Sequence, residues 1–242
     1  MKPPRQTPQS LPIYVQIAEL LTRDIVAGRL IDGERLAPER DMAATLGISV
    51  GTLRKALNIM VEKGLIARVH GSGNYVLAAG DTGTVYAMFR LELLEGGGLP
   101  RADVLDLDLL DKPADLPDFG TASQGTRIRR LRWLNDTIIA VEEIWLDADA
   151  GLIDHETMSE SLYATYRKQL GLWIQRAEDR VSLGRVPNWA PQSYGPNPGN
   201  TVGYIERLSW ADTTASHTSL AAIEFSRTWY DPDCAVYVQR LK

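Results

Sequence analysis

The stretch from residue 38 to residue 63 constrains the fold most, because it holds two helical patterns with almost no chain between them. The first pattern, PERDMAATLG, ends at Gly47, a residue suited to the left-handed turn after a helix. Only Ile48 and Ser49 separate it from VGTLRKALNIMVEK, and the Ser49 hydroxyl can cap that helix. Two helices joined by so short a turn predict a helix-turn-helix. The residues expected to face inward are Met42, Ala43, Leu46, Leu53, Leu57, Met60 and Val61.

A further helix and a hairpin flank this pair. Between Leu11 and Gly28 apolar residues recur at helical spacing, and Pro12 suits the first turn. After Gly64 come two strand-like runs, LIARV and NYVLA, separated by HGSG, whose glycines suit a tight hairpin. Three helices followed by a β-hairpin wing are therefore predicted. The apolar stripe of the first helix is Ile13, Ile17, Leu20, Leu21 and Ile25.

The pattern resembles the DNA-binding domain of GntR-type transcription regulators over residues 11 to 77. The acidic-Arg pair, the LGIS turn, the TLRKAL helix, the EKGLI exit and the HGSGNYV wing occur in the family's order and spacing. The resemblance implies a winged helix-turn-helix that binds double-stranded DNA. The positions it assigns to DNA contact, with neighbours on the same helix, are Arg40, Ser49, Val50, Gly51, Thr52, Arg54, Lys55, His70 and Gly71, and Asn58 is a secondary candidate.

The chemistry of these positions suits DNA. Arg40 and Arg54 can donate hydrogen bonds to phosphates or to guanine edges, and the backbone N–H groups at a helix N-terminus can donate to phosphates. Val50 and Gly51 stand where many family members have Arg and Thr, so the operator sequence does not carry over. The alternative is a winged helix that contacts only protein; exposed polar side chains on the recognition helix favour DNA.

Charge and composition divide the chain. The net charge is -5, yet residues 1 to 78 hold ten Lys or Arg against seven Asp or Glu, and the remainder holds 16 against 24. A polyanion therefore fits the first part better. With no long apolar run and no secretory signal after MKPPRQTPQS, we expect a cytoplasmic protein without a membrane partner. A single cysteine, Cys234, and no Cys or His cluster predict no disulfide, metal or cofactor.

The second part is predicted to be an α+β domain built on an antiparallel sheet. AAGDTGT, residues 78–84, is small and polar like a linker, which separates a DNA-binding domain at 1–77 from a second domain at 85–242. Most of the latter consists of β-rich runs, and Asn135-Asp136 is the hairpin connection between two of them. Helical signal is confined to MSESLYATYRKQL and RLELLEGG.

This half resembles the UTRA effector domain of HutC-type GntR regulators, which has a chorismate-lyase-like fold. The motifs are RIRRLR, AVEEIWL, SLYATY and IEFSRTWY, in that order. The resemblance implies a pocket for a small acidic metabolite such as a sugar phosphate. The residues it assigns to that pocket are Arg130, Arg132, Glu142, Ser161, Tyr163, Glu224, Arg227 and Tyr230.

The residue types agree with this assignment. Arg130 and Arg132 lie two apart on a predicted strand and so share a face, where two guanidinium groups need an anion. Glu142 and Glu224 can accept from ligand hydroxyls, and Ser161 begins a predicted helix whose N-terminus suits an anion. The structural alternative is that the Arg and Glu residues form ion pairs across neighbouring strands.

Two other functions compete with a ligand-controlled regulator. An enzyme is disfavoured, because no nucleophile-base pair, phosphate-binding loop or metal set is apparent. An architectural DNA-binding protein would ignore every small molecule. We therefore expect a homodimeric repressor on a palindromic operator, in which an anionic effector changes the distance between the two DNA-binding domains.

Overall fold

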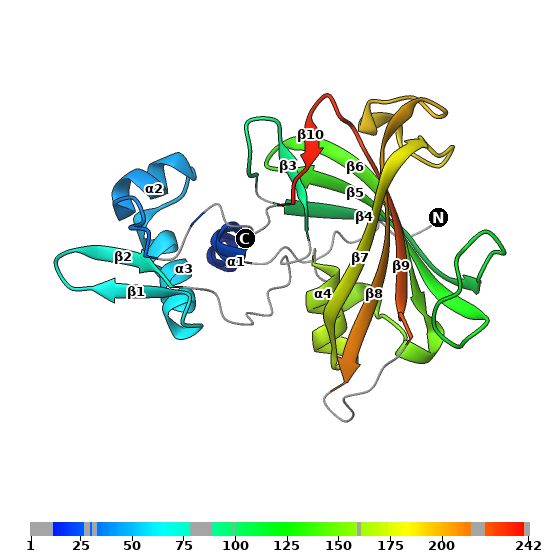
Figure 1. The fold of residues 1–242 in the computed structure, drawn as a ribbon, viewed down its shortest axis with the longest axis horizontal. Coiled ribbons are helices and arrows are strands. Elements are labelled where there is room, and N and C mark those ends of the chain that lie inside the picture. Colours follow the sequence, from blue (N-terminus) through cyan, green and yellow to red (C-terminus); the bar gives the residue numbers. More distant parts are fainter. Residues whose placement is uncertain are drawn as a thin grey trace. The chain divides into compact units, whose positions relative to one another are not determined.

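The computed structural model describes residues 12–26, 30, 33–77, 89–98, 100–158, 161–213 and 221–239 (Figure 1). The chain divides into two compact units, described separately here: one within residues 11–91, joined by the residues from Tyr237 on, and one within residues 92–236. The expected linker at residues 78–84 lies outside the described residues. No helix among the described residues has the length and apolarity needed to cross a membrane.

The first unit has the predicted three helices and hairpin. Strands β1 and β2 pair antiparallel, from Ile66 opposite Val76 to Val69 opposite Gly73. The glycines of the HGSG turn have positive φ angles, 74° at Gly71 and 128° at Gly73, as a tight hairpin requires. The elements are α1 (Ile13–Val26), α2 (Glu39–Thr45), α3 (Val50–Glu62), β1 (Ile66–Val69) and β2 (Gly73–Val76).

Local sequence signals fix the boundaries of α2 and α3. Gly47 follows α2 with φ at 64°, the left-handed conformation that glycine adopts without strain. The Ser49 side chain accepts a hydrogen bond from the Thr52 N–H and caps α3 as predicted. Gly47 and Ser49 are thus close in sequence to the helix ends that they determine, which is why the sequence alone could predict both ends.

The helices bury most of the predicted stripes, but two of the predicted residues are exposed and two others, Met42 and Leu46, are only half-buried. Leu53, Leu57 and Met60 of α3 are fully buried, but Val61 is 38% exposed. In α1 the predicted inward residue Ile13 is 49% exposed. Ile13 opens its helix and Val61 lies on the margin of its stripe, so these two predictions were wrong.

The second unit is built on a six-stranded antiparallel sheet, drawn as one curved surface in Figure 1. The strand order is β4-β5-β6-β9-β8-β7, so β9 lies centrally and β7 is an edge strand. Asn135 connects β5 to β6 with φ at 53°, as expected for the predicted hairpin. The strands are β4 (Pro100–Asp111), β5 (Gln124–Leu134), β6 (Thr137–Asp147), β7 (Leu172–Arg185), β8 (Thr201–Thr213) and β9 (Glu224–Tyr230).

The remaining elements correct two predictions. RLELLEGG was expected to be helical, but β3 (Leu91–Leu93) is a strand that pairs with β10 (Ala235–Tyr237). Such a short apolar run does not distinguish helix from strand by itself. In MSESLYATYRKQL the α-helix α4 covers only Leu162–Thr165 and is followed by a π-helical turn, Tyr166–Leu170. Short 3-10 turns lie at Ala148–Ala150, His155–Thr157 and Gln192–Tyr194.

The sheet has two differently covered faces. On one, which we call the α4 face, Ile128, Ile144 and Leu146 pack with Leu162 and Tyr166. On the opposite face, which we call the Phe119 face, one cluster gathers Phe119, Trp145 and Phe225, and a second gathers Val141, Tyr194 and Trp229. Because side chains alternate along a strand, the register assigns every functional candidate to one face.

Candidate DNA interface and effector site

The N-terminus of α3 is organised by its own polar side chains. The hydroxyl groups of Ser49 and Thr52 share a hydrogen bond of 2.8 Å, in addition to the cap. Val50 and Gly51 form the first turn of the helix beside them. These four residues present short side chains and backbone donors, which suits close approach of a DNA backbone.

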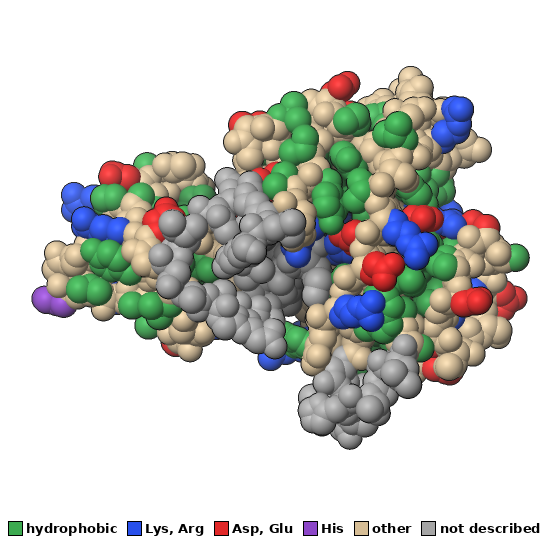
Figure 2. All heavy atoms as spheres, in the orientation of Figure 1, with side chains coloured by type: hydrophobic (Ala, Val, Ile, Leu, Met, Phe, Trp, Pro, Cys, Tyr) green, Lys and Arg blue, Asp and Glu red, His purple; other side chains and the backbone are tan. Residues whose placement is uncertain are grey.

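Arg54 projects from α3 and is held by its neighbour helix. Its Nε donates to Oε2 of Glu39 at 2.6 Å, while the Arg54 side chain is 64% exposed. Lys55 is also exposed, and its ammonium lies 5.9 Å from the ring centre of Tyr14. Arg40 is exposed on α2. Figure 2 shows Lys and Arg side chains grouped on the surface of this unit.

Arg68 of β1 is a residue that the sequence reasoning missed. Its Nη2 donates to Oδ1 of Asn58 on α3 at 3.0 Å, and its Nε donates to Oδ1 of Asn74 on β2 at 3.3 Å. It therefore connects the recognition helix with both strands of the wing. Asn58, a secondary candidate for DNA contact, has this structural role in the free protein. His70 and Gly71 lie exposed at the tip of the same wing.

In the second unit, Arg130, Arg132 and Glu142 form one buried cluster on the α4 face. Arg130 is directly opposite Glu142 in the β5–β6 register. Oε2 of Glu142 accepts from Arg130 Nη2 at 2.6 Å and Nε at 3.0 Å, and lies 3.4 Å from Arg132 Nη1. Thr228 of β9 donates to the other oxygen of Glu142 at 3.4 Å. The prediction that Arg130 and Arg132 share one face is thus confirmed, and the anion between them is the carboxylate of Glu142.

Glu224 centres a second cluster on the same face. It accepts from the hydroxyls of Tyr166 at 2.6 Å, Ser209 at 2.8 Å and Tyr163 at 3.3 Å. Tyr166 is fully buried and was not among the predicted site residues. Only its place five residues after Ser161, at the end of the motif SLYATY, could have suggested it.

The two carboxyl groups differ in their electrostatics. Burial alone would raise the pKa of Glu142, but the charges of Arg130 and Arg132 outweigh it and hold the pKa below its usual value. For Glu224 burial prevails and raises the pKa, although the hydroxyls of Tyr166 and Ser209 oppose the shift. The α4 face thus offers one firmly ionised carboxylate and one carboxyl that is more readily protonated.

The other predicted residues divide between the faces. Ser161 is buried, and its hydroxyl accepts from the Ala164 N–H at 3.3 Å, so it caps the single turn of α4. Tyr230 is opposite Ala140 and Gly203, on the α4 face. Arg227 lies on the Phe119 face, where its guanidinium donates to Asp115 Oδ2 at 2.8 Å. The structure therefore brings seven of the eight together and separates Arg227 from them.

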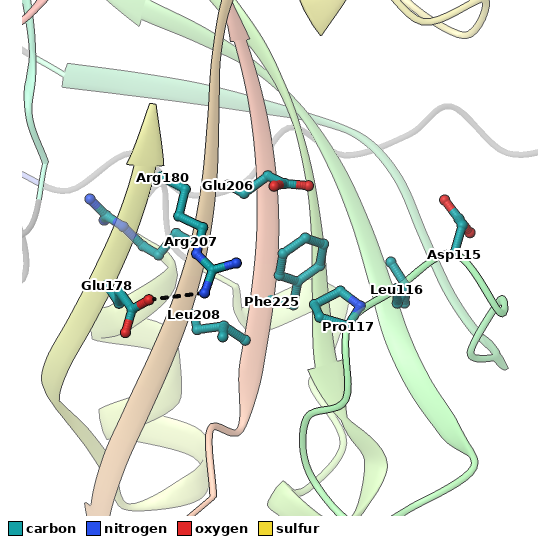
Figure 3. A pocket seen from close by; sticks show the side chains of 9 residues that line it. All are labelled: Asp115, Leu116, Pro117, Glu178, Arg180, Glu206, Arg207, Leu208 and Phe225. Atoms are coloured by element: carbon teal, nitrogen blue, oxygen red, sulfur yellow. Dashed lines mark hydrogen bonds and ion pairs between the residues drawn. The ribbon is translucent and has the colours of Figure 1, made fainter. Parts of the chain in front are cut away.

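A cavity of about 300 Å³ opens on the Phe119 face (Figure 3). Its charged wall includes Glu178, Arg180 and Glu206, and Arg180 contacts Glu178 at 3.4 Å. Acidic groups outnumber basic ones here, so the cavity suits an anion poorly. The lining residues are Asp115, Leu116, Pro117, Glu178, Arg180, Glu206, Arg207, Leu208 and Phe225.

Comparisons with known proteins agree with both halves. Residues 13–76 match the model of the bacterial regulatory proteins of the gntR family, and residues 95–234 match the UTRA domain. The HTH-type transcriptional regulator SmoD of Agrobacterium fabrum is 56% identical over 98% of this chain and 100% of its own length. The HTH-type transcriptional repressor NagR of Bacillus subtilis is 27% identical over 85% of this chain and 86% of its own.

Solved structures share the fold. YydK from Bacillus subtilis is 21% identical, with a TM-score of 0.50 over 96% of this chain and 100% of that one. The ligand-binding domain of a GntR-family regulator from Bordetella bronchiseptica is 22% identical, with a TM-score of 0.51 over 63% of this chain and 96% of that one. The family models and the 56% identical relative show that this chain belongs to the GntR family of DNA-binding transcriptional regulators and carries a UTRA effector domain.

Proposed function

We propose that this regulator is a repressor and that a small acidic metabolite, such as a sugar phosphate, releases it from its operator. One observation carries the proposal: two guanidinium groups are buried side by side on the α4 face and share the carboxylate of Glu142. A phosphate or carboxylate of a ligand can exchange with that carboxylate in bidentate hydrogen bonds. Repression is supported by the relative NagR, which is named a transcriptional repressor.

The proposed effector site contains the seven predicted residues that share the α4 face. The proposed DNA interface is the predicted set on α2, α3 and the wing tip. Because Arg227 is hydrogen-bonded to Asp115 on the Phe119 face, we leave it out of the effector site. Arg130 and Arg132 form ion pairs with Glu142 across β5 and β6, as expected if these residues had only a structural role. In the proposed site, the ligand displaces or extends these ion pairs. The effector residues are Arg130, Arg132, Glu142, Ser161, Tyr163, Glu224 and Tyr230.

The experiment begins with a duplex that the protein itself selects from a random library. Operator affinity is measured by fluorescence anisotropy with hexose 6-phosphates, hexonic acids and the neutral hexoses. We expect at least one acid to raise the Kd at least tenfold and its neutral parent to have no effect. Arg130→Gln should abolish the response, while the exposed Arg180→Gln, on the other face, should keep it. Equal responses to acids and neutral parents, or no response at all, would refute the proposal.

We further propose that the protein is a homodimer joined through its C-terminal sheets, so that two recognition helices meet a palindromic operator. The edge strand β7 supports this, because Val181 and Leu183 expose 48% and 75% of their surface. Sedimentation velocity should show a dimer, and Leu183→Asp should shift it toward the monomer. A wild-type monomer at micromolar concentration would contradict this part of the proposal.

A further inference from the structure

The register places a third arginine among the proposed effector residues. On β9, the residues on the α4 face are Glu224, Ser226, Thr228 and Tyr230, and Ser226 lies directly between Ile144 of β6 and Arg207 of β8. Arg207 in turn lies opposite Asp179 of the edge strand β7. The cluster around Glu142 and the cluster around Glu224 therefore continue into each other across the centre of the sheet.

Arg207 is oriented by a fork-like ion pair. Its Nε donates to Oδ1 of Asp179 at 2.5 Å and its Nη2 donates to Oδ2 at 2.7 Å. Both side chains are more than four-fifths buried, at 17% and 12% exposure. In a planar guanidinium paired in this way, the other N–H groups point away from the carboxylate. Arg207 also influences the pKa of Glu142, Tyr163 and Glu224, so it lies near members of both clusters.

The charges differ at the two ends of this assembly. Arg130 and Arg132 both contact the carboxylate of Glu142, so two guanidinium groups meet at the β5 end, whereas Arg207 pairs with Asp179 at the β8 end. An anionic group is therefore best placed at the β5 end. At the β8 end the guanidinium of Arg207 faces the carboxylate of Asp179, and the carboxyl groups of Asp179 and Glu224 would repel an anion placed there. That end suits hydroxyl groups, which can accept from Arg207 and donate to a carboxylate.

We propose that Arg207, positioned by Asp179, and Ser226 bind the hydroxyl groups of the effector, which is a polyhydroxylated compound with a single anionic group. The effector lies across β9, with its acid at Arg130 and Arg132 and its hydroxyls at Ser226 and Arg207. This inference rests on the proposed function, because it assumes that the α4 face is the effector site. It adds the orientation of the effector on the sheet, and it excludes compounds with an acidic group at each end as effectors.

The test compares two kinds of probe on the full-length protein. Inorganic phosphate reports on the anion end alone, and the hexose 6-phosphates report on both ends. By isothermal titration calorimetry, Arg207→Met should weaken the tightest hexose 6-phosphate at least tenfold and leave phosphate unchanged within twofold, while Arg130→Met weakens both. The matched control is Arg180→Met, which removes a charge from the neighbouring strand on the opposite face. 6-Phosphogluconate, with an acid at each end, should bind more weakly than glucitol 6-phosphate.

A second variant guards against misfolding of Arg207→Met. Ser226→Val changes no ion pair, and it should weaken the hexose phosphate but not inorganic phosphate. If Arg207→Met and Ser226→Val both leave hexose phosphate binding intact, or weaken phosphate equally, the inference is wrong while the proposed function stands. If the wild-type protein binds none of these probes and no hexonic acid raises its operator Kd, both the inference and the proposed function are wrong.

Discussion

Arg54 of α3 donates its Nε–H to Glu39 of α2 at 2.6 Å, so a carboxylate on the neighbouring helix orients the exposed cation of the recognition helix. A guanidinium held in this way meets DNA with little loss of side-chain entropy. We predict that Arg54→Ala weakens operator binding by about 1–3 kcal/mol. The slope of log K against log salt should fall by about 0.9 if the lost contact is to a phosphate. Fluorescence anisotropy on the selected duplex, at several salt concentrations, measures both quantities.

The control for this prediction removes the same charge elsewhere. Arg180→Ala lies on the sheet of the other unit and should change neither the affinity nor the slope. If Arg54→Ala binds the operator like the wild-type protein at every salt concentration, Arg54 does not contact DNA.

Asp147 at the end of β6 anchors the connection between β4 and β5. Its Oδ2 accepts from the ammonium of Lys112 and from the backbone N–H groups of Thr121 and Ala122, and its Oδ1 accepts from the Asp149 N–H at 3.0 Å. The residue is only 2% exposed. Asp147→Asn leaves the Lys112 charge without its partner, so we predict a loss of about 3 kcal/mol in the free energy of unfolding.

Urea unfolding followed by tryptophan fluorescence tests this prediction. All six tryptophans lie beyond residue 132, so the signal reports on the second unit. Asp149→Asn is the control: its exposed carboxylate accepts one hydrogen bond, from the Thr121 hydroxyl, and its loss should cost less than about 1 kcal/mol. Equal costs for the two variants would refute the anchoring role.

The features that sequence could predict are those decided within one segment. The Ser49 cap, the Gly47 turn, the Asn135 hairpin and the common face of Arg130 and Arg132 all depend on spacing along the chain. The partners of Arg207 and Tyr166 depend instead on the order of strands in the sheet, which places β8 beside β9 and β9 beside β6. Arg227 lies three residues after Glu224 on the same strand, so alternation alone places the two on opposite faces. Which of the two faces holds the effector site becomes known only from the neighbouring strands.

Gly203 of β8 makes room for a predicted ligand-binding residue. A Cβ at this position would lie 2.1 Å from Cζ of the Tyr230 ring, so any side chain must displace that ring. We predict that Gly203→Ala costs about 1–3 kcal/mol of unfolding free energy. A double-mutant cycle identifies the cause: in a Tyr230→Ala background, the same substitution should cost less than half as much. Additive costs would mean that the clash lies elsewhere.

The pH dependence of stability should separate Glu142 from Glu224. The pKa of Glu142 is held below the ordinary value of 4.5 by Arg130 and Arg132. Its ionised form therefore stabilises the fold fully above 4.5, and that contribution is lost as the pH falls through the lowered pKa. Glu142→Gln should be less stable than the wild type at neutral pH by about 3 kcal/mol, because it leaves buried arginines unpaired. The difference should shrink between about pH 5 and pH 3.

Glu224→Gln is the matched comparison, since the pKa of Glu224 is raised by burial. The wild-type protein then loses stability as the pH rises from 4.5 through that raised pKa, because a buried carboxyl must ionise. A glutamine avoids this cost, so Glu224→Gln should become more stable relative to the wild type as the pH rises above about 5. In that range the destabilisation of Glu142→Gln has already reached its full size. Urea titrations at half-unit steps from pH 3 to pH 8 would show two difference curves of opposite slope. Parallel curves would contradict the assignment of one ionised and one readily protonated carboxyl to the α4 face.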